Sequence, residues 1–360
     1  MEAAEAEYCR AQLITYLGNK RKQLSFIDKG VQHVRERLGG KPLRCFDAFA
    51  GSGVVSRYLK RYSSDLYSND LEPYAAVLGS CYLANRSVVK QLDLPKLHAK
   101  LKATIGKKWA PGLIAELYAP QDDRNIRPGE RAYYTRRNAV YLDTARCAIA
   151  ALPLQVQPYF LAPLLYEASV HANTGIMFKS FYKGAKGCGQ FGGRKGQSLD
   201  RIMADIELPM PIFSEHECNC MVLQGDATRV ARKLKELDMA YLDPPCHPYP
   251  YSSNYFMLNL LTEYKRPEKL SRVSGIPQGW NRSDYNSRAR AAGALKKLLS
   301  KLPTKYALLS YHAEGLLTRD EILELAAEDW KVQVMEQDSP ARRADRAPRT
   351  TERLYVMERR

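Results

Sequence analysis

The sequence lacks any long uninterrupted apolar stretch. No run approaches the ~20 residues that a helix needs to span a bilayer, so we expect no membrane-spanning helix. The amino terminus is acidic from Met1 to Glu7, whereas a signal peptide begins with basic residues, so we expect no secretory leader. These absences predict a soluble, cytoplasmic protein that has no membrane partner.

Acidic residues are too few to balance the basic ones. The chain has 55 lysines and arginines against 39 aspartates and glutamates, which gives a formal net charge of +16. Such an excess favours a polyanionic partner, because lysine and arginine neutralise phosphates and release counterions. Nucleic acid is the first interpretation, and an acidic membrane surface is the alternative. At 360 residues the chain is long enough for a full α/β domain and a smaller insertion.

Regular spacing of metal ligands is also missing. Eight cysteines are scattered along the chain, and without an export signal we expect reduced thiols rather than disulfides. His216, Cys218 and Cys220 could begin a zinc site with Cys188 as the fourth ligand, but this spacing is irregular for such sites. We therefore expect thiols in loops and in the core, and no metal.

Short apolar runs alternate with helical segments. This alternation predicts an α/β fold with a doubly wound, Rossmann-like sheet. Two late runs, residues 331–335 and 354–357, are separated by a loop rich in proline and arginine, which predicts an antiparallel pair at the edge of the sheet. The runs expected to form the parallel strands are residues 44–49, 65–68, 220–223, 239–242 and 306–310.

A long interruption separates the second expected strand from the third. We therefore predict three parts: residues 1–94 as the cofactor-binding part of a catalytic domain, 95–219 as an inserted helical and target-recognition region, and 220–360 as the remainder of the catalytic domain. Within the insertion, spaced apolar faces predict helices at residues 134–152 and 159–172.

Residues 178–201 combine basic side chains, aromatic rings and six glycines. That composition suits a flexible element lying along a phosphate backbone, although a solvated surface loop has the same composition. With the overall positive charge, it predicts double-stranded DNA as the partner. The residues expected to contact DNA in this segment are Lys179, Lys183, Lys186, Arg194 and Lys195.

A glycine turn, Asp47-Ala48-Phe49-Ala50-Gly51-Ser52-Gly53, follows the first expected strand. Glycine lets the chain turn sharply and bring backbone N–H groups against a ligand at a helix N-terminus. Asp70 ends the next strand about 20 residues later, where an acidic side chain can hold both ribose hydroxyls of a nucleoside. Together these features predict an adenosine-containing cofactor. The missing third glycine of a dinucleotide fingerprint argues against NAD.

Asp243-Pro244-Pro245 ends the apolar run at residues 239–242. Two fixed φ angles stiffen the chain there, so the Asp243 carboxylate is held at the carboxyl edge of a buried parallel strand. In open α/β sheets this edge is where ligands bind. The alternative is that the two prolines only end a strand. Asp-Pro-Pro followed by an aromatic residue is the amino-methyltransferase signature, and Cys246 departs from it.

These motifs occur in the order seen in one family. The ordered set resembles the Dam-like, alpha-group DNA adenine methyltransferases, and the resemblance touches nearly the whole chain. An ordered set is far more specific than any single motif in it. The segments that carry the resemblance are Tyr16-Leu17-Gly18-Asn19-Lys20, the glycine turn, Asn69-Asp70, Asn173-Thr174-Gly175, Gln224-Gly225-Asp226, Asp243-Pro244-Pro245, Tyr251-Ser252-Ser253-Asn254-Tyr255 and residues 309–316.

The resemblance implies transfer of a methyl group from S-adenosylmethionine to N6 of an adenine in double-stranded DNA. It implies that the adenine is rotated out of the duplex, with its amine donating to Asp243 and to the Pro244 carbonyl. We also expect a restriction–modification setting, but the sequence does not indicate whether a cognate restriction endonuclease is a partner. The implied cofactor residues are Tyr16, Lys20, Asp47, Phe49, Gly51, Gly53, Asp70 and Asp226; the catalytic set is Asp243, Pro244, Pro245 and Cys246; Tyr251, Asn254 and Tyr255 join the DNA-binding residues.

Cys246 stands where the family places an aromatic residue that stacks on the flipped base. Such stacking is worth ~1–3 kcal/mol per base, so a thiol weakens base capture unless Tyr249, Tyr251 or Tyr255 supplies the missing face. Cys246 could instead act as a nucleophile, as in cytosine C5 methylation. Further alternatives are a catalytically impaired DNA-binding protein on the same scaffold and a cytosine-N4 methyltransferase. The sequence indicates neither the recognition site nor the oligomeric state.

Overall fold

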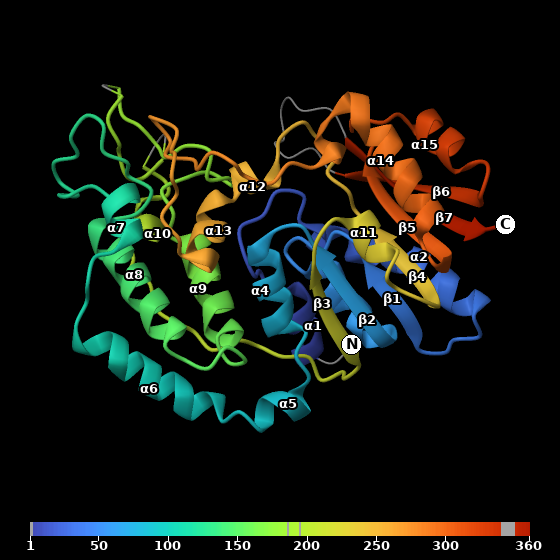
Figure 1. Cartoon of the computed structure of the whole chain (residues 1–360), viewed down its shortest axis with the longest axis horizontal. Helices are drawn as coiled ribbons and strands as arrows, with labels where there is room; N and C mark the ends of the chain where they lie inside the picture. The colour runs from blue at the N-terminus through green and yellow to red at the C-terminus, as the bar shows by residue number, and fades with distance from the viewer. Residues whose placement is uncertain (1–2, 186, 194–195, 340–349) are drawn as a thin grey trace.

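The computed structural model describes residues 3–185, 187–193, 196–339 and 350–360. Lys186, Arg194 and Lys195, which we expect to contact DNA, lie outside the described residues. Figure 1 shows a sheet with helices on its faces and, beside it, a region made of helices and long loops. Within the described ranges, no helix is both long enough and apolar enough to cross a membrane.

One seven-stranded sheet, in the order β3-β2-β1-β4-β5-β7-β6, organises the fold. The first five strands along the chain pair in parallel, and β7 lies antiparallel between β5 and β6. The predicted doubly wound α/β sheet with an antiparallel edge pair is confirmed. The strands are β1 (Leu43–Asp47), β2 (Ser63–Asp70), β3 (Asn219–Gln224), β4 (Leu237–Leu242), β5 (Thr304–His312), β6 (Trp330–Ser339) and β7 (Thr350–Arg359).

Helices cover both faces of the sheet. In β1, Leu43 and Cys45 belong to one hydrophobic cluster and Phe46 to the cluster on the opposite face, so alternate side chains are buried on both sides. This explains why the parallel strands read as continuous apolar runs. On the Leu43 side lie α2 (Leu24–Arg37), α3 (Val54–Leu59) and α4 (Pro73–Tyr82); on the other lie α11 (Ala227–Ala231), α14 (Arg288–Lys301) and α15 (Arg319–Ala326).

The inserted segment forms a helical region with its own core (Figure 1). Its predicted helices are confirmed as α8 (Arg136–Ala150) and α9 (Pro158–Val170). Later in the chain, α13 (Phe256–Glu263) packs against α9 and α4, so residues on both sides of the Asp-Pro-Pro motif share one core. The three-part division of the sequence stays a prediction. The other helices are α1 (Ala3–Arg10), α5 (Arg86–Lys90), α6 (Leu94–Lys107), α7 (Leu113–Tyr118), α10 (Leu199–Met203), α12 (Tyr251–Asn254) and three 3₁₀ turns, η1 (Lys20–Gln23), η2 (Lys60–Tyr62) and η3 (Asp284–Asn286).

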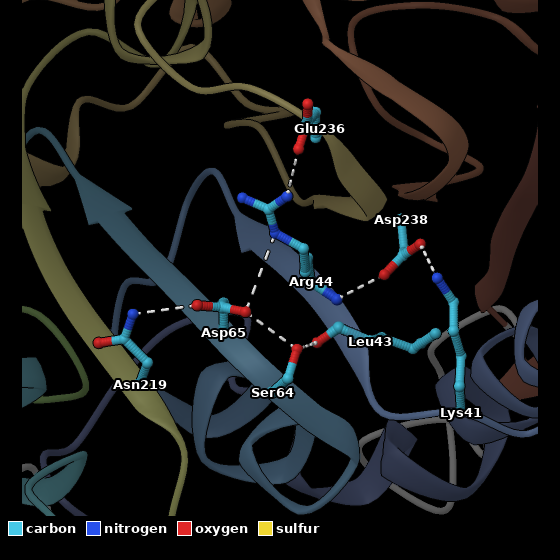
Figure 2. Close-up of polar contacts among 8 residues, drawn as sticks. All are labelled: Lys41, Leu43, Arg44, Ser64, Asp65, Asn219, Glu236 and Asp238. Atoms are coloured by element: carbon cyan, nitrogen blue, oxygen red, sulfur yellow. Dashed lines mark hydrogen bonds and ion pairs between the residues drawn. The ribbon is translucent and has the colours of Figure 1, made fainter.

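The strand order creates a switch point between β1 and β4. The chain continues from β1 to β2 on one side, whereas β4 pairs with β1 on the other side. At such a point a crevice opens at the carboxyl ends of the strands. The amino ends are closed by a polar network, in which Asp238 accepts hydrogen bonds from the Arg44 backbone and the Lys41 ammonium at 2.8 and 2.9 Å (Figure 2).

Candidate active site

A cavity of about 420 Å³ lies at the carboxyl ends of β1, β2 and β4. The expectation that the sheet edge gathers the sequence motifs therefore agrees with the geometry, because Asp243 shares this cavity with Gly51 and Asp70. Gly53 does not line it. The predicted residues that do line the cavity are Tyr16, Lys20, Asp47, Phe49, Gly51, Asp70, Asp226, Asp243, Pro244, Pro245, Cys246 and Tyr251.

The two glycines of the turn have different roles. Gly51 has a φ of +54°, and a Cβ added there would lie 2.8 Å from the Tyr16 hydroxyl oxygen, so both conformation and space require glycine. Gly53 has a φ of +75° and is the N-cap of α3, and its N–H donates to the Ala50 carbonyl at 2.8 Å. Gly53 shapes the turn from outside the cavity lining, and its contact with the cofactor stays a prediction.

Asp70 links β2 to the glycine turn. One carboxylate oxygen accepts from the Gly51 N–H at 2.7 Å, and the other accepts from the Glu72 N–H at 2.9 Å. Burial raises the pKa of Asp70, while these backbone donors act in the opposite direction. The carboxylate is thus fixed at the cavity wall by its own strand end and by the turn that faces it.

Asp47 presents an unsatisfied oxygen at the same wall. Its Oδ2 accepts from the Ser56 hydroxyl at 2.6 Å, and its buried Oδ1 has no hydrogen-bond partner among the described residues. Burial raises the pKa of Asp47 to about 7. A buried carboxyl oxygen without a partner is costly, so the wall favours a ligand that brings a hydrogen-bond donor or a positive charge.

The ionisable groups that line the cavity are mostly acidic, although the protein as a whole is basic. Seven carboxyl groups line it against one ammonium group, that of Lys20, although the chain as a whole carries +16. Such a lining favours a cationic ligand and opposes the phosphates of a dinucleotide. The carboxyl groups belong to Asp47, Asp70, Glu72, Asp226, Asp243, Glu314 and Glu352.

The buried acids predict a pH-dependent stability. Burial raises the pKa of Asp47 and of Glu72 to about 7 in the folded protein, above their ordinary values of 3.8 and 4.5. Between these pKa values the folded state therefore holds protons that the unfolded chain has released, and this proton uptake stabilises the fold. The stabilisation is complete below pH 4 and is lost as the pH rises through 7. One such group contributes up to about 4 kcal/mol.

The test uses Asp47→Asn. Its free energy of unfolding should fall less between pH 5 and pH 8 than that of the unmodified chain, as measured by urea denaturation. Asp238→Asn, at the amino end of β4, should retain the full difference, because Asp238 lies outside the cavity lining and pairs with the exposed Lys41. An Asp47→Asn variant with the same pH difference as the unmodified chain would contradict the assignment to Asp47.

Asp243 forms an ion pair with Lys20. Their Oδ1 and Nζ atoms lie 2.9 Å apart, and both side chains are largely buried. Burial disfavours the charged form of Lys20, but Asp243 and Glu352 more than compensate, so the Lys20 pKa is raised. Burial also raises the pKa of Asp243, and Lys20 opposes that rise. Lys20, which the resemblance assigns to the cofactor, therefore lies against the predicted catalytic carboxylate.

The Cys246 thiol is not poised as a nucleophile. Burial and the neighbouring Asp243 raise its pKa to about 11, so the thiol keeps its proton at neutral pH. A reactive cysteine needs a lowered pKa, because the thiolate is the attacking species. The Cys246 carbonyl accepts from the Leu316 N–H at 3.0 Å, which ties the segment after β4 to the turn after β5.

Two of the predicted DNA-binding residues need correction. Asn254 and Tyr255 are 1% and 0% exposed, so neither presents a side chain to DNA. Tyr255 instead accepts from the Leu17 N–H at 2.6 Å and stacks on Tyr16, with ring centroids 4.9 Å apart. Tyr251 stacks on the same Tyr16 ring at 5.3 Å. These rings support the wall of the cavity.

The basic segment at residues 178–201, which we call the glycine loop, keeps two of its described basic side chains at the surface, whereas Arg201 is half-buried and donates to the Ala172 carbonyl at 3.0 Å. Lys179 and Lys183 are both exposed. The Lys179 ammonium lies 4.0 Å from the centroid of the exposed Tyr249 ring, close to the segment that follows the Asp-Pro-Pro motif. Both lysine side chains are therefore accessible from solvent.

Several lining residues were missed by the sequence reasoning. Glu72 follows Asp70 by two residues and could have been found from that spacing; its carboxylate accepts from Asn259 at 2.6 Å and from Ser252. The ring of Tyr285 packs edge to face on that of Phe49, with ring centroids 5.1 Å apart. The two residues are far apart in the sequence, so no local pattern could have predicted this contact. Glu352 comes from the last strand, and no motif surrounds it.

The comparisons with known proteins agree with this geometry. A family model described as D12 class N6 adenine-specific DNA methyltransferase matches residues 16–314. The type II methyltransferase M.NlaIII of Neisseria lactamica is 24% identical, over 96% of this chain and 99% of that enzyme. M.CviAII of Paramecium bursaria Chlorella virus 1 is 25% identical, over 89% of this chain and 90% of that enzyme.

A third relative is longer than this chain. The modification methylase LlaI of Lactococcus lactis subsp. lactis is 26% identical, over 86% of this chain and 48% of that enzyme. Neither the cytosine-N4 alternative nor the impaired DNA-binding scaffold is favoured by these matches. Because the matched model spans the glycine turn, Asp243 and most of the sheet, the chain belongs to the D12 class N6 adenine-specific DNA methyltransferase family.

Proposed function

We propose that this adenine-N6 DNA methyltransferase takes its methyl group from S-adenosylmethionine and acts on an adenine rotated out of double-stranded DNA. The observation that supports the cofactor best is the acidic cavity in a basic protein. S-adenosylmethionine carries a sulfonium and an ammonium group, and both suit a wall of carboxylates, including the Asp47 oxygen that has no partner in the described ranges.

The residues around the glycine turn would hold the cofactor. Asp70 lies where a carboxylate can accept from ribose hydroxyls, and Asp226 lies at the start of α11, at the end of the cavity proposed for the adenine amino group. Phe49 and Tyr285 supply an aromatic wall. Tyr16 closes the turn against Gly51, and Asp47 faces the cationic end. When bound, S-adenosylmethionine supplies a methyl group on a positively charged sulfur.

The Asp-Pro-Pro segment would position the adenine amine. Asp243 and the Pro244 carbonyl would accept hydrogen bonds from its two N–H groups. This arrangement directs the nitrogen lone pair out of the base plane, toward the part of the cavity that holds the methyl donor. Lys20 opposes the rise that burial causes in the Asp243 pKa, and so favours the carboxylate form, which accepts rather than donates. A paired base cannot reach an enclosed group of this kind, so the adenine has to leave the stack.

The experiment that tests this function uses S-adenosylmethionine labelled in its methyl group. Purified chain is incubated with this donor and with duplexes that contain every short adenine context, and the nucleosides are then separated. We expect label in N6-methyladenine. Label in N4-methylcytosine, or saturable donor binding with no transfer to any duplex, would contradict the proposal. Sequencing of methylated bases in cells that express the chain then defines the recognition motif.

The exposed lysines of the glycine loop predict a salt-dependent DNA affinity. Each lysine that neutralises one phosphate contributes about 0.9 to the slope of log K against log salt concentration. Lys179→Gln and Lys183→Gln should each reduce that slope by roughly this amount. The matched control is Lys100→Gln on α6, because α6 lies on the side of the molecule away from α12 (Figure 1). Unchanged slopes for both loop variants would locate the phosphate contacts elsewhere.

A restriction endonuclease is the proposed biological partner. The relatives M.NlaIII and M.CviAII carry the name type II methyltransferase, and M.NlaIII matches this chain over nearly its whole length. An endonuclease that cuts the motif methylated by this chain, and that fails to cut the methylated motif, is the expected finding. Such an activity encoded next to this gene would support the pairing.

A further inference from the structure

The cysteine at residue 246 leaves the proposed flipped base without a stacking ring at that position. Of the three tyrosines considered as replacements, only Tyr251 lines the cavity, and its ring already belongs to a stacked cluster with Tyr16 and Tyr255. Tyr255 is fully buried, and Tyr249 is 53% exposed and does not line the cavity. Tyr251 lines it, but its ring is stacked on Tyr16 and Tyr255, with centroids 5.3 and 6.0 Å away.

The other aromatic pair in the cavity belongs to the cofactor end. Phe49 lies in the glycine turn, and Tyr285 meets it edge to face at 5.1 Å. Tyr285 also lies close enough to Asp226 for that carboxylate to raise its pKa, although burial is the larger cause. Asp226 precedes α11, which follows β3, so this pair lies beside the residue proposed for the adenine of the cofactor.

Two histidine rings line the cavity beside Cys246. His247 is the next residue, and His312 ends β5, the strand that neighbours β4. Their ring centroids are 5.9 Å apart with a 57° angle between planes, so the pair offers the face of one ring and the edge of the other. Both rings are half-buried, which leaves part of each surface open to the cavity. Imidazole is one of the rings on which splayed bases stack in proteins.

The backbone holds both histidines in place. The His247 carbonyl accepts from the Asn286 amide at 2.8 Å, and the His312 carbonyl accepts from the Gly315 N–H at 2.9 Å. The Glu314 N–H donates to the His312 Nδ1 at 3.1 Å, and this hydrogen bond favours the tautomer of His312 that carries its proton on Nε2. Burial and the neighbouring His312 lower the pKa of His247. The lowered pKa favours the neutral form of the His247 ring near pH 7.

We propose that His247 and His312 form the surface on which the extruded adenine stacks, in place of an aromatic residue at position 246. The inference rests on the proposed function, because it assigns the base-contacting rings of that same reaction. It explains how a chain with a thiol at this position keeps a complete base pocket. The two rings come from adjacent strand ends, so the surface is built by the fold and not by one motif.

The test compares alanine, phenylalanine and glutamine at each histidine. Alanine at either position should lower kcat/KM for the methylated duplex roughly 5- to 150-fold, the range expected for loss of one stacked base. Phenylalanine should retain activity within about threefold, and glutamine should behave like alanine, because only phenylalanine restores a ring. The affinity for S-adenosylmethionine, measured by calorimetry, should stay within twofold in all variants.

Controls separate this inference from the function on which it rests. His33→Ala, on α2 and away from the cavity lining, should leave kcat/KM unchanged. If both alanine variants retain activity within twofold, the stacking role is wrong, but the proposed function still stands. If the glutamine variants retain activity and the phenylalanine variants lose it, the stacking role is also wrong, and the histidines act through hydrogen bonds instead. If the unmodified chain methylates no adenine, the proposed function fails and this inference fails with it.

Discussion

Replacing Asp243 with asparagine should lower kcat for adenine methylation by about 10²–10³, the usual cost of removing one preorganised electrostatic partner from an active site. Asparagine keeps the size of the side chain but brings an amide that can present a donor to the adenine amine. It also leaves the Lys20 ammonium, 2.9 Å away in the unmodified chain, without its counterion. The measurement is single-turnover transfer of labelled methyl to duplex DNA, with donor affinity measured separately.

The matched control for Asp243→Asn is Asp238→Asn on the same strand. Asp238 lies at the amino end of β4 and accepts from Lys41 and the Arg44 backbone (Figure 2), whereas the cavity lies at the carboxyl ends of the strands. It should leave kcat within twofold, although it can lower stability. If Asp243→Asn and Asp238→Asn have equal kcat values, Asp243 does not position the amine.

Replacing Lys20 with methionine should move the acid limb of the pH–rate profile to higher pH by about one unit or more. Burial raises the pKa of Asp243, and Lys20 opposes the rise. Without the ammonium, burial and the Glu352 charge act unopposed, so Asp243 is protonated at a higher pH. A protonated Asp243 donates a hydrogen bond instead of accepting one, so activity at pH 7 should fall and should recover in part above pH 8.

The Lys20→Met variant should also lose up to about 3 kcal/mol of unfolding free energy at pH 8, because it leaves a largely buried carboxylate unpaired. Lys41→Met is the control, since Lys41 pairs with Asp238 at the same 2.9 Å but is exposed. The pH–rate profile of Lys41→Met should match that of the unmodified chain. A Lys20→Met profile with an unmoved acid limb would mean that Lys20 does not govern the Asp243 charge.

The sheet and its carboxyl edge were predictable because Asp47, Asp70 and Asp243 each follow or end a short apolar run. Parallel strands bring such positions to one edge, so three separate motifs indicate one site without any knowledge of side-chain packing. Most strands were longer than their apolar runs, whereas β1 ends at Asp47, two residues before the end of its predicted run. For example, β2 extends over Ser63–Asp70, because backbone pairing with β1 and β3 continues past the apolar residues.

The remainder of the cavity depends on long-range pairing that local patterns do not encode. Glu352 reaches the site because β7 runs antiparallel to β5, which sets Glu352 opposite His312 in the register. For Tyr255 and Asn254 the sequence predicted contact with DNA, but both side chains are buried. Their polar and aromatic character favours a surface role, but α13 and the segment before it pack into the helical core, which buries both residues. No short-range signal distinguishes these outcomes.

The acidic lining of the cavity also bears on turnover. Methyl transfer converts the sulfonium of the proposed donor into a neutral thioether, so the spent molecule carries one positive charge fewer than the fresh one. Seven carboxyl groups facing a single ammonium attract the fresh molecule more strongly than the spent one. Electrostatics therefore favours replacement of the spent molecule by a fresh donor after each reaction. Raising the salt concentration should reduce the difference in affinity between the fresh and the spent molecule.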